Sequence, residues 1–125
     1  MKPVLALHHA SILVRDTRRS LEFYAGVLGM QIDDSRPDLG FPGAWLQAGD
    51  QQLHLLELPG PDPVDGRPEH AGHDRHLAWL VAELGVLEQR LTQAGIVFSR
   101  SRSGRRALFC RDPDGNGVEL IERET

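Results

Sequence analysis

Three histidines and one glutamate are of residue types that bind divalent metals, and they recur at related spacings. They are His9, His54, His76 and Glu119. His54 lies 45 residues after His9, and Glu119 lies 43 residues after His76. Imidazole and carboxylate groups together suit borderline cations such as Ni, Zn, Fe, Co or Mn. The first hypothesis is therefore a single divalent metal held by these four side chains.

The alternation of strand faces supports this hypothesis, because successive side chains of a strand point to opposite faces. In the predicted first strand, Ala10, Ile12 and Val14 form an apolar face suited to packing on a helix, and His9 lies on the other face. The same pattern places the other three candidate ligands on the non-helix faces of their strands. Buried polar groups gathered there would be costly without a cation to bind.

Four other residues compete for the same role. Strand parity places His8 on the helix side, and it places Glu57 on the opposite face from His54. His70 and His73 lie in a segment rich in proline and glycine. We expect all four to stand outside the metal site.

The elements that would position the ligands occur in one order and then repeat. The first half predicts strands near 7–14, 30–33, 44–48 and 51–58, with a helix from Asp16 to Leu28. The second half predicts strands near 75–81, 96–99, 106–111 and 118–122, with a helix from about Leu84. Each half reads βαβββ, so the fold class is α+β with two modules in tandem. We expect one domain over 1–125, with module one at about 4–58, a linker at about 59–74 and module two at about 75–123.

Glycines and turn residues mark corresponding boundaries in the two halves. Gly29 lies 20 residues after His9, and Gly95 lies 19 residues after His76. Each glycine is predicted to end a helix in the left-handed conformation. The run DPDG at 112–115 predicts a tight turn before the last strand. A duplication explains these coincidences better than chance.

Composition narrows the class of protein. The chain has 125 residues, 40% hydrophobic and 26% charged, which is typical of one globular domain. A net charge of −4 argues against a nucleic-acid partner, although arginines gather at 100–106, where we predict a solvated loop. No run approaches the roughly 18 apolar residues of a membrane helix, and the N-terminus does not read as a signal peptide, so we expect a soluble, cytoplasmic protein. The single cysteine, Cys110, is predicted to be a small buried side chain.

Several motifs together resemble one known family over nearly the whole chain. They are HASILVRD at 9–16, SLEFY at 20–24, LGM at 28–30, HLAWLV at 76–81 and DPDGNGVEL at 112–120. This set resembles the vicinal oxygen chelate superfamily, which includes glyoxalase I, extradiol dioxygenases and bleomycin-binding proteins. The resemblance implies paired βαβββ modules forming a cup-shaped mixed sheet around a metal.

The resemblance also implies a role for each candidate residue. His9 matches the first-strand ligand, His54 the fourth-strand position, His76 the fifth-strand histidine and Glu119 the last-strand glutamate. One departure concerns the reaction and not the fold. Glyoxalases usually carry a glutamate, and epimerases a glutamine or glutamate, where this chain has His54.

Three functions follow from this set of residues. We expect a metal-dependent enzyme acting on a small molecule, a lyase or isomerase that stabilises a metal-bound enediolate, with Glu119 or His54 as the catalytic proton shuttle. An extradiol-type dioxygenase is the alternative, with His9, His76 and Glu119 as its triad. A non-catalytic small-molecule binding or resistance protein is a third reading. We also expect a homodimer, because curved sheets with open edges invite pairing.

Overall fold

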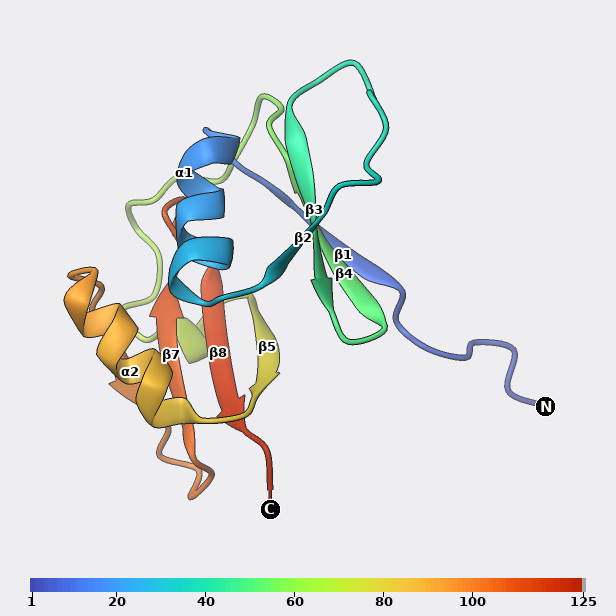
Figure 1. The fold of residues 1–125 in the computed structure, drawn as a ribbon. Coiled ribbons are helices and arrows are strands. Elements are labelled where there is room, and N and C mark those ends of the chain that lie inside the picture. Colours follow the sequence, from blue (N-terminus) through green and yellow to red (C-terminus); the bar gives the residue numbers. More distant parts are fainter. Residues whose placement is uncertain (125) are drawn as a thin grey trace. The chain divides into compact units, whose positions relative to one another are not determined.

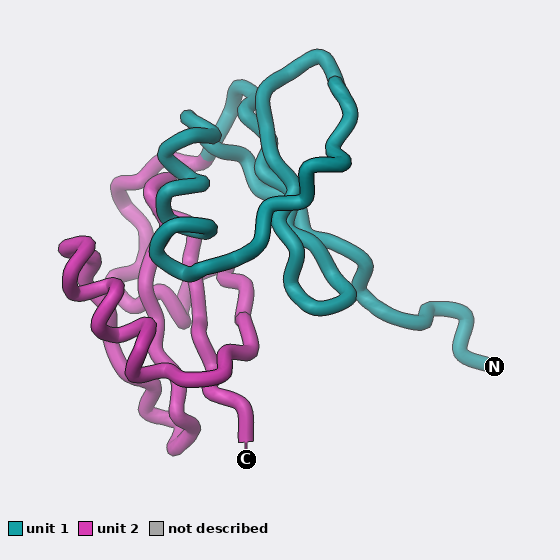
Figure 2. The backbone as a smooth tube through the Cα atoms, viewed as in Figure 1, with its two compact units in different colours: residues 1–61 teal, residues 62–125 magenta. Residues whose placement is uncertain are grey.

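The structure is a computed structural model that describes residues 1–124. The chain divides into two compact units, Met1–Pro61 and the remainder from Asp62 onward (Figure 2). Each unit is built on one four-stranded mixed sheet (Figure 1).

Unit 1 contains four strands and one helical segment. Its elements are β1 (His9–Leu13), α1 (Thr17–Leu21), η1 (Glu22–Val27), β2 (Gln31–Asp33), β3 (Gly43–Ala48) and β4 (Gln51–Leu56). The sheet order is β1-β4-β3-β2, in which β1 pairs with β4 in parallel and the other pairs are antiparallel. A parallel neighbour cannot be reached by a tight turn, so the chain leaves β1 through the helical segment.

Unit 2 repeats this plan with one short addition at its start. Its elements are η2 (Ala71–His73), β5 (His76–Val81), α2 (Leu84–Gln93), β6 (Ser99–Arg100), β7 (Ala107–Arg111) and β8 (Gly117–Glu122). The sheet order is β5-β8-β7-β6, and β5 pairs with β8 in parallel. The predicted α+β class with tandem βαβββ modules is confirmed.

The first helix differs in type from the single α-helix that the sequence predicts. Asp16 caps it as expected, because its carboxylate accepts from the Arg18 backbone N–H at 3.0 Å. After Leu21 the winding becomes π-helical, and the Leu28 N–H donates to the carbonyl of Phe23, five residues back, at 2.9 Å. The α-helical spacing predicts that Leu21, Tyr24, Val27 and Leu28 face inward together. Of these only Tyr24 is buried, with Ser20 and Phe23, while the other three are partly exposed.

The end of α2 explains why the strand predicted at 96–99 is shorter than expected. Gly95 takes the left-handed conformation at φ 73°, and its N–H donates to the Thr92 carbonyl. The next N–H, of Ile96, donates to the Leu91 carbonyl at 2.9 Å. These two bonds form a Schellman motif, which includes Ile96, the first residue of the predicted strand. Pairing with β7 therefore begins only at Ser99.

The helix-facing sides of both sheets carry the core. Leu53 and Leu55 of β4 are at most 1% exposed, as the alternation predicts. Leu108 and Leu120 are equally buried in unit 2, and Leu91 of α2 is fully buried. The opposite faces are thereby left to polar side chains. Within residues 1–124, no helix is long and apolar enough to cross a membrane.

Both units secure the start of their helix with a glutamate from the sheet. The Thr17 N–H donates to Glu57 at 2.7 Å, and the Leu84 N–H donates to Glu122 at 2.9 Å. The first N–H groups of a helix have no partner within the helix, so these carboxylates supply one. Each glutamate stands three residues after the candidate ligand of its strand. Glu57, expected outside the metal site, has this structural role instead.

Replacing Glu57 by alanine removes the acceptor for the Thr17 N–H. We expect the free energy of unfolding to fall by about 1 kcal/mol, the usual cost of losing a helix cap. Urea unfolding followed by circular dichroism measures this change. Glu124→Ala, at an exposed position near the end of the chain, is the control and should leave the midpoint unchanged. A Glu57→Ala midpoint equal to that of the wild type would contradict the capping role.

Candidate metal centre

The parallel strand pairs bring the candidate ligands together two by two, with the same register in each unit. In unit 1, Ser11 lies opposite His54 across β1 and β4. In unit 2, Ala78 lies opposite Glu119 across β5 and β8. His9 and His76 each stand two residues before the residue that faces the second ligand, and therefore on the same face of the sheet. The duplication thus extends to the geometry of the ligand pairs.

The unit 1 pair forms part of a row of stacked rings across three strands. The rings of His9 and His54 stack with centroids 4.2 Å apart and planes 17° apart. Trp45, opposite His54 on β3, stacks on that ring at 4.6 Å and 12°. His8 lies outside β1, and its Nδ1 is 2.9 Å from the Nδ1 of His9. Strand parity therefore does not separate His8 from His9 as the sequence suggested, because β1 begins at His9.

His54 has a local environment that favours its neutral form. Burial lowers the pKa of its imidazole, and the positive charge that His9 and His8 can carry lowers it further. A neutral imidazole is the form that binds a metal or accepts a proton. Its Nε2 lies 2.9 Å from the Oε1 of Gln52, two residues earlier on the same face.

The unit 2 pair brings an imidazole nitrogen against a buried carboxylate. The Nε2 of His76 lies 3.2 Å from the Oε1 of Glu119, whose side chain is only 5% exposed. The Nδ1 of His76 lies 2.9 Å from the Asp74 carbonyl. Since a carbonyl can only accept, Nδ1 carries a proton, and in the neutral ring Nε2 presents its lone pair to the carboxylate.

A lone pair facing a carboxylate at this distance requires a cation between them, either a proton or a metal ion. Two ligand atoms at right angles on a metal, each about 2.1 Å from it, are about 3 Å apart. The separation of His76 Nε2 and Glu119 Oε1 matches this value. The bond from Nδ1 to a carbonyl is also the usual way in which a protein orients a metal-binding histidine. The residues of unit 2 therefore fit a divalent cation.

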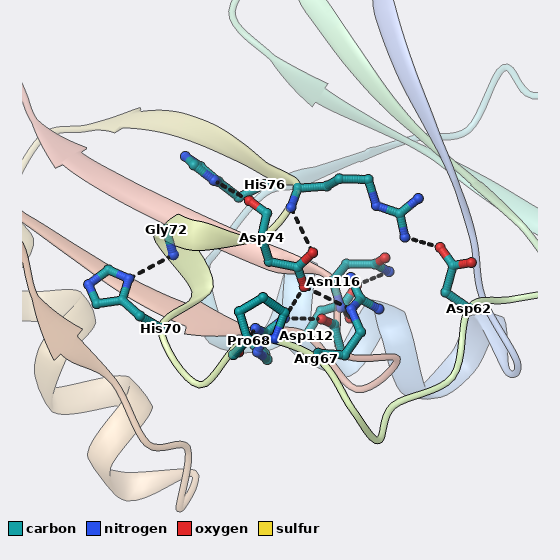
Figure 3. Close-up of polar contacts among 12 residues, drawn as sticks. Asp62, Arg67, Pro68, His70, Gly72, Asp74, His76, Asp112 and Asn116 are labelled. Carbon is teal, nitrogen blue, oxygen red and sulfur yellow. Dashed lines mark hydrogen bonds and ion pairs between the residues drawn. The ribbon is translucent and has the colours of Figure 1, made fainter.

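Asp74, which supplies that carbonyl, is held by two arginines (Figure 3). Its Oδ2 accepts from Arg67 Nε at 2.7 Å and from Arg111 Nη1 at 2.8 Å. These bonds hold the pKa of Asp74 well below its usual range. Arg111 also donates to the carbonyls of Gly115 and Pro68. The segment before β5 is thereby fixed, and with it the acceptor that orients His76.

The predicted turn before β8 is confirmed. The Gly115 N–H donates to the Asp112 carbonyl at 3.0 Å, and Gly115 has φ 83°. The Asp112 carboxylate accepts from the backbone N–H groups of Asp114 and Asn116 at 2.9 and 2.8 Å. This closed turn sets where β8 begins, two residues before Glu119.

The structure adds one contact that sequence reasoning missed. Arg105, predicted to belong to a solvated loop, lies with Nη2 3.4 Å from the Oε2 of Glu119 while its own side chain is 60% exposed. Loop sequence alone carries no signal for such a contact. His70 and His73, which we expect to stand outside the site, lie at η2. His70 accepts from the Gly72 N–H to cap η2, and its ring stacks on His73 at 4.8 Å.

The structure thus brings together His9 with His54 in unit 1, and His76 with Glu119 in unit 2. Within residues 1–124, no three side chains of His, Cys, Asp or Glu gather into a metal-binding group. The site of four ligands remains a prediction from the sequence.

Comparison with known proteins identifies the family. A family model described as Glyoxalase/Bleomycin resistance protein/Dioxygenase superfamily matches residues 6–120. The chain belongs to this superfamily.

The chain is 35% identical to "Glyoxylase I 4" of Arabidopsis thaliana, over 92% of this chain and 69% of the relative. It is 34% identical to the uncharacterised protein YwkD of Bacillus subtilis, over 94% and 97% of the two chains. A solved glyoxalase-family structure from Bacillus anthracis matches with TM-score 0.80 at 20% identity, over 99% of both chains. The resemblance inferred from the motifs is confirmed.

The structure also bears on whether this superfamily member could use a cysteine nucleophile. Cys110 of β7 is 3% exposed, so the predicted burial is confirmed. Burial, with a smaller effect from Asp112, raises the pKa of the thiol to about 12. Only the thiolate is nucleophilic, so this side chain is inert at neutral pH.

We expect Cys110 in the folded protein at pH 8 to react with a water-soluble aromatic disulfide at least about a hundredfold more slowly than a free thiol. The same protein in urea should release one equivalent of chromophore at the free-thiol rate. Rapid release of one equivalent from the folded protein would show that the thiol is accessible and ionised.

Proposed function

We propose that this chain is a divalent-metal-dependent enzyme of the glyoxalase type that acts as a lyase or isomerase beside a carbonyl group of a small molecule. His9, His54, His76 and Glu119 would hold the metal. The observation that carries the proposal is the contact of His76 Nε2 with the buried Glu119 carboxylate, a pair of atoms that a divalent cation could join. Membership of a superfamily that includes glyoxalases supports the reaction class.

A bound divalent cation would supply Lewis acidity and stabilise negative charge on substrate oxygens. The protein side chains supply the remaining functions. The neutral ring of His54 can accept a proton, and Glu119 is a second group of suitable chemistry. Arg105, at 3.4 Å from Glu119, adds positive charge beside that carboxylate. His54 and Glu119 are therefore the proposed proton-transfer residues.

One observation favours a second candidate, an extradiol-type dioxygenase. The Nε2 of His54 is bonded to Gln52, so His54 could reach a metal only through Nδ1, and a centre without it would consist of His9, His76 and Glu119. This set is typical of non-haem iron oxygenases. Oxygen uptake on a catechol that depends on Fe(II), with His54 not bound to the metal, would favour this candidate over the first.

The test is the metal content of protein purified without added metal and then reloaded with single cations. We expect about one divalent ion per chain by elemental analysis. Glu119→Gln and His76→Ala should each weaken the affinity by roughly tenfold or more, because loss of an outer partner alone costs that much. Affinity is measured by competition with a chromogenic chelator.

His73→Ala is the matched control, because His73 lies outside the ligand pairs and is exposed. It should bind metal as the wild type does, and so should Glu57→Ala. Absence of metal from the wild type under every loading condition, or unchanged affinity in His76→Ala, would contradict the proposal and favour a binding protein without metal.

We also propose that the protein is a homodimer, with a cytoplasmic location. β1 and β2 are the edge strands of the unit 1 sheet, and edge strands favour association. Sedimentation velocity at micromolar concentration should give twice the chain mass of 13.9 kDa. A species of the chain mass at that concentration would refute the dimer.

A further inference from the structure

The polar face of the unit 1 sheet carries a chain of hydrogen bonds that ends on His54. Gln52 stands at its centre. The Nε2 of Gln52 donates to Asp33 Oδ2 at 2.6 Å and to Gln47 Oε1 at 3.0 Å. The Oε1 of Gln52 lies 2.9 Å from the Nε2 of His54. The register of β2, β3 and β4 places these four side chains on neighbouring positions.

Two neighbours fix the orientation of the Gln52 amide independently. The carboxylate of Asp33 can only accept, so the group facing it must be the NH₂ of Gln52. The other carboxylate oxygen of Asp33, Oδ1, accepts hydrogen bonds from the backbone N–H and the hydroxyl of Ser35, at 2.9 and 2.7 Å. Gln47 directs its own NH₂ to the Gly49 carbonyl at 2.7 Å, so it offers an oxygen to Gln52. The Gln52 oxygen must therefore face His54.

This orientation determines the proton of His54. An amide oxygen can only accept, so the Nε2 of His54 must carry the hydrogen, and in the neutral ring the lone pair lies on Nδ1. The rings of Trp45 and His9, stacked on either side, hold the plane of the imidazole. The tautomer of His54 is thus determined by the carboxylate of Asp33, which acts through the amide of Gln52.

We propose that Gln52, held by Asp33 and Gln47, is a positioning residue that fixes His54 in the Nε2–H tautomer, so that Nδ1 is the atom offered to a metal or a substrate proton. The tautomer itself stands on the hydrogen bonds of unit 1. Its consequence for chemistry rests on the proposed function. No pattern in the sequence singles out Asp33 or Gln52.

The direct test is the nitrogen-15 spectrum of the histidine side chains of the metal-free wild-type protein at neutral pH. His54→Gln identifies the His54 signals by their loss. We expect a protonated Nε2 and an unprotonated Nδ1 for His54. Gln52→Leu should convert these signals to the averaged shifts of a mixture of tautomers.

Gln51→Leu is the matched control, because Gln51 is the preceding residue of β4, is exposed and points to the other face. It should leave the His54 signals unchanged. A wild-type His54 with its proton on Nδ1, or a Gln52→Leu variant that keeps the pure Nε2–H form, would overturn the proposal.

A second readout connects the tautomer with the proposed metal. We expect Gln52→Leu to weaken metal affinity about tenfold, as loss of an outer-sphere partner does. If the wild type binds no metal, the proposed function fails while the spectra still decide the tautomer. If the wild type binds metal and Gln52→Leu binds it equally well, the positioning role is wrong and the proposed function stands.

Discussion

The parallel pairing at one edge of each sheet is the constraint on which the site depends. Two strands that run in the same direction cannot be joined by a tight turn, so each module contains a helical crossover between the first strand and the next strands. The crossover covers one face of the sheet and buries its leucines. The other face is then open to polar side chains. In both the β1–β4 and the β5–β8 pair, the first candidate ligand lies two residues before the residue that pairs with the second candidate ligand. The duplication therefore places a pair of candidate ligands at equivalent positions in each unit.

The residues next to these pairs have separate tasks, and the duplication preserves one of them, the helix cap. Glu57 and Glu122 stand three residues beyond the candidate ligands and cap the helices on the covered face. On the open face, Gln52 contacts His54, and the backbone of Asp74 contacts His76. Cap and ligand therefore occupy opposite faces of one strand end, which is how a strand can support the fold and a site at once.

Local signals in the sequence predict much of the fold. Asp16 and Gly95 mark helix ends because their roles depend only on the neighbouring backbone. Strand parity separates the buried leucines from the candidate ligands because that alternation is local as well. The π-helical turn after Leu21 and the shortened β6 escape prediction. Both depend on which backbone groups pair several residues away.

The surroundings of the site are less accessible to sequence reasoning than its ligands. Asp33 reaches Gln52 only because β2, β3 and β4 pair in one register, and no local pattern links residues 33 and 52. Asp74 acts on His76 through its carbonyl, which every residue possesses. Arg105 reaches Glu119 from a loop. Residue type identifies groups that can bind a metal, whereas tertiary pairing decides their protonation and orientation.

X-ray absorption at the metal edge of the reloaded protein tests most directly whether the two pairs belong to one metal centre. The account predicts about three imidazoles and one carboxylate, with nitrogen and oxygen atoms at about 2.0–2.2 Å from the metal. Loss of one imidazole contribution in His9→Ala, and of another in His76→Ala, would show that both units contribute. A spectrum without imidazole scattering, or one that His9→Ala leaves unchanged, would contradict the account.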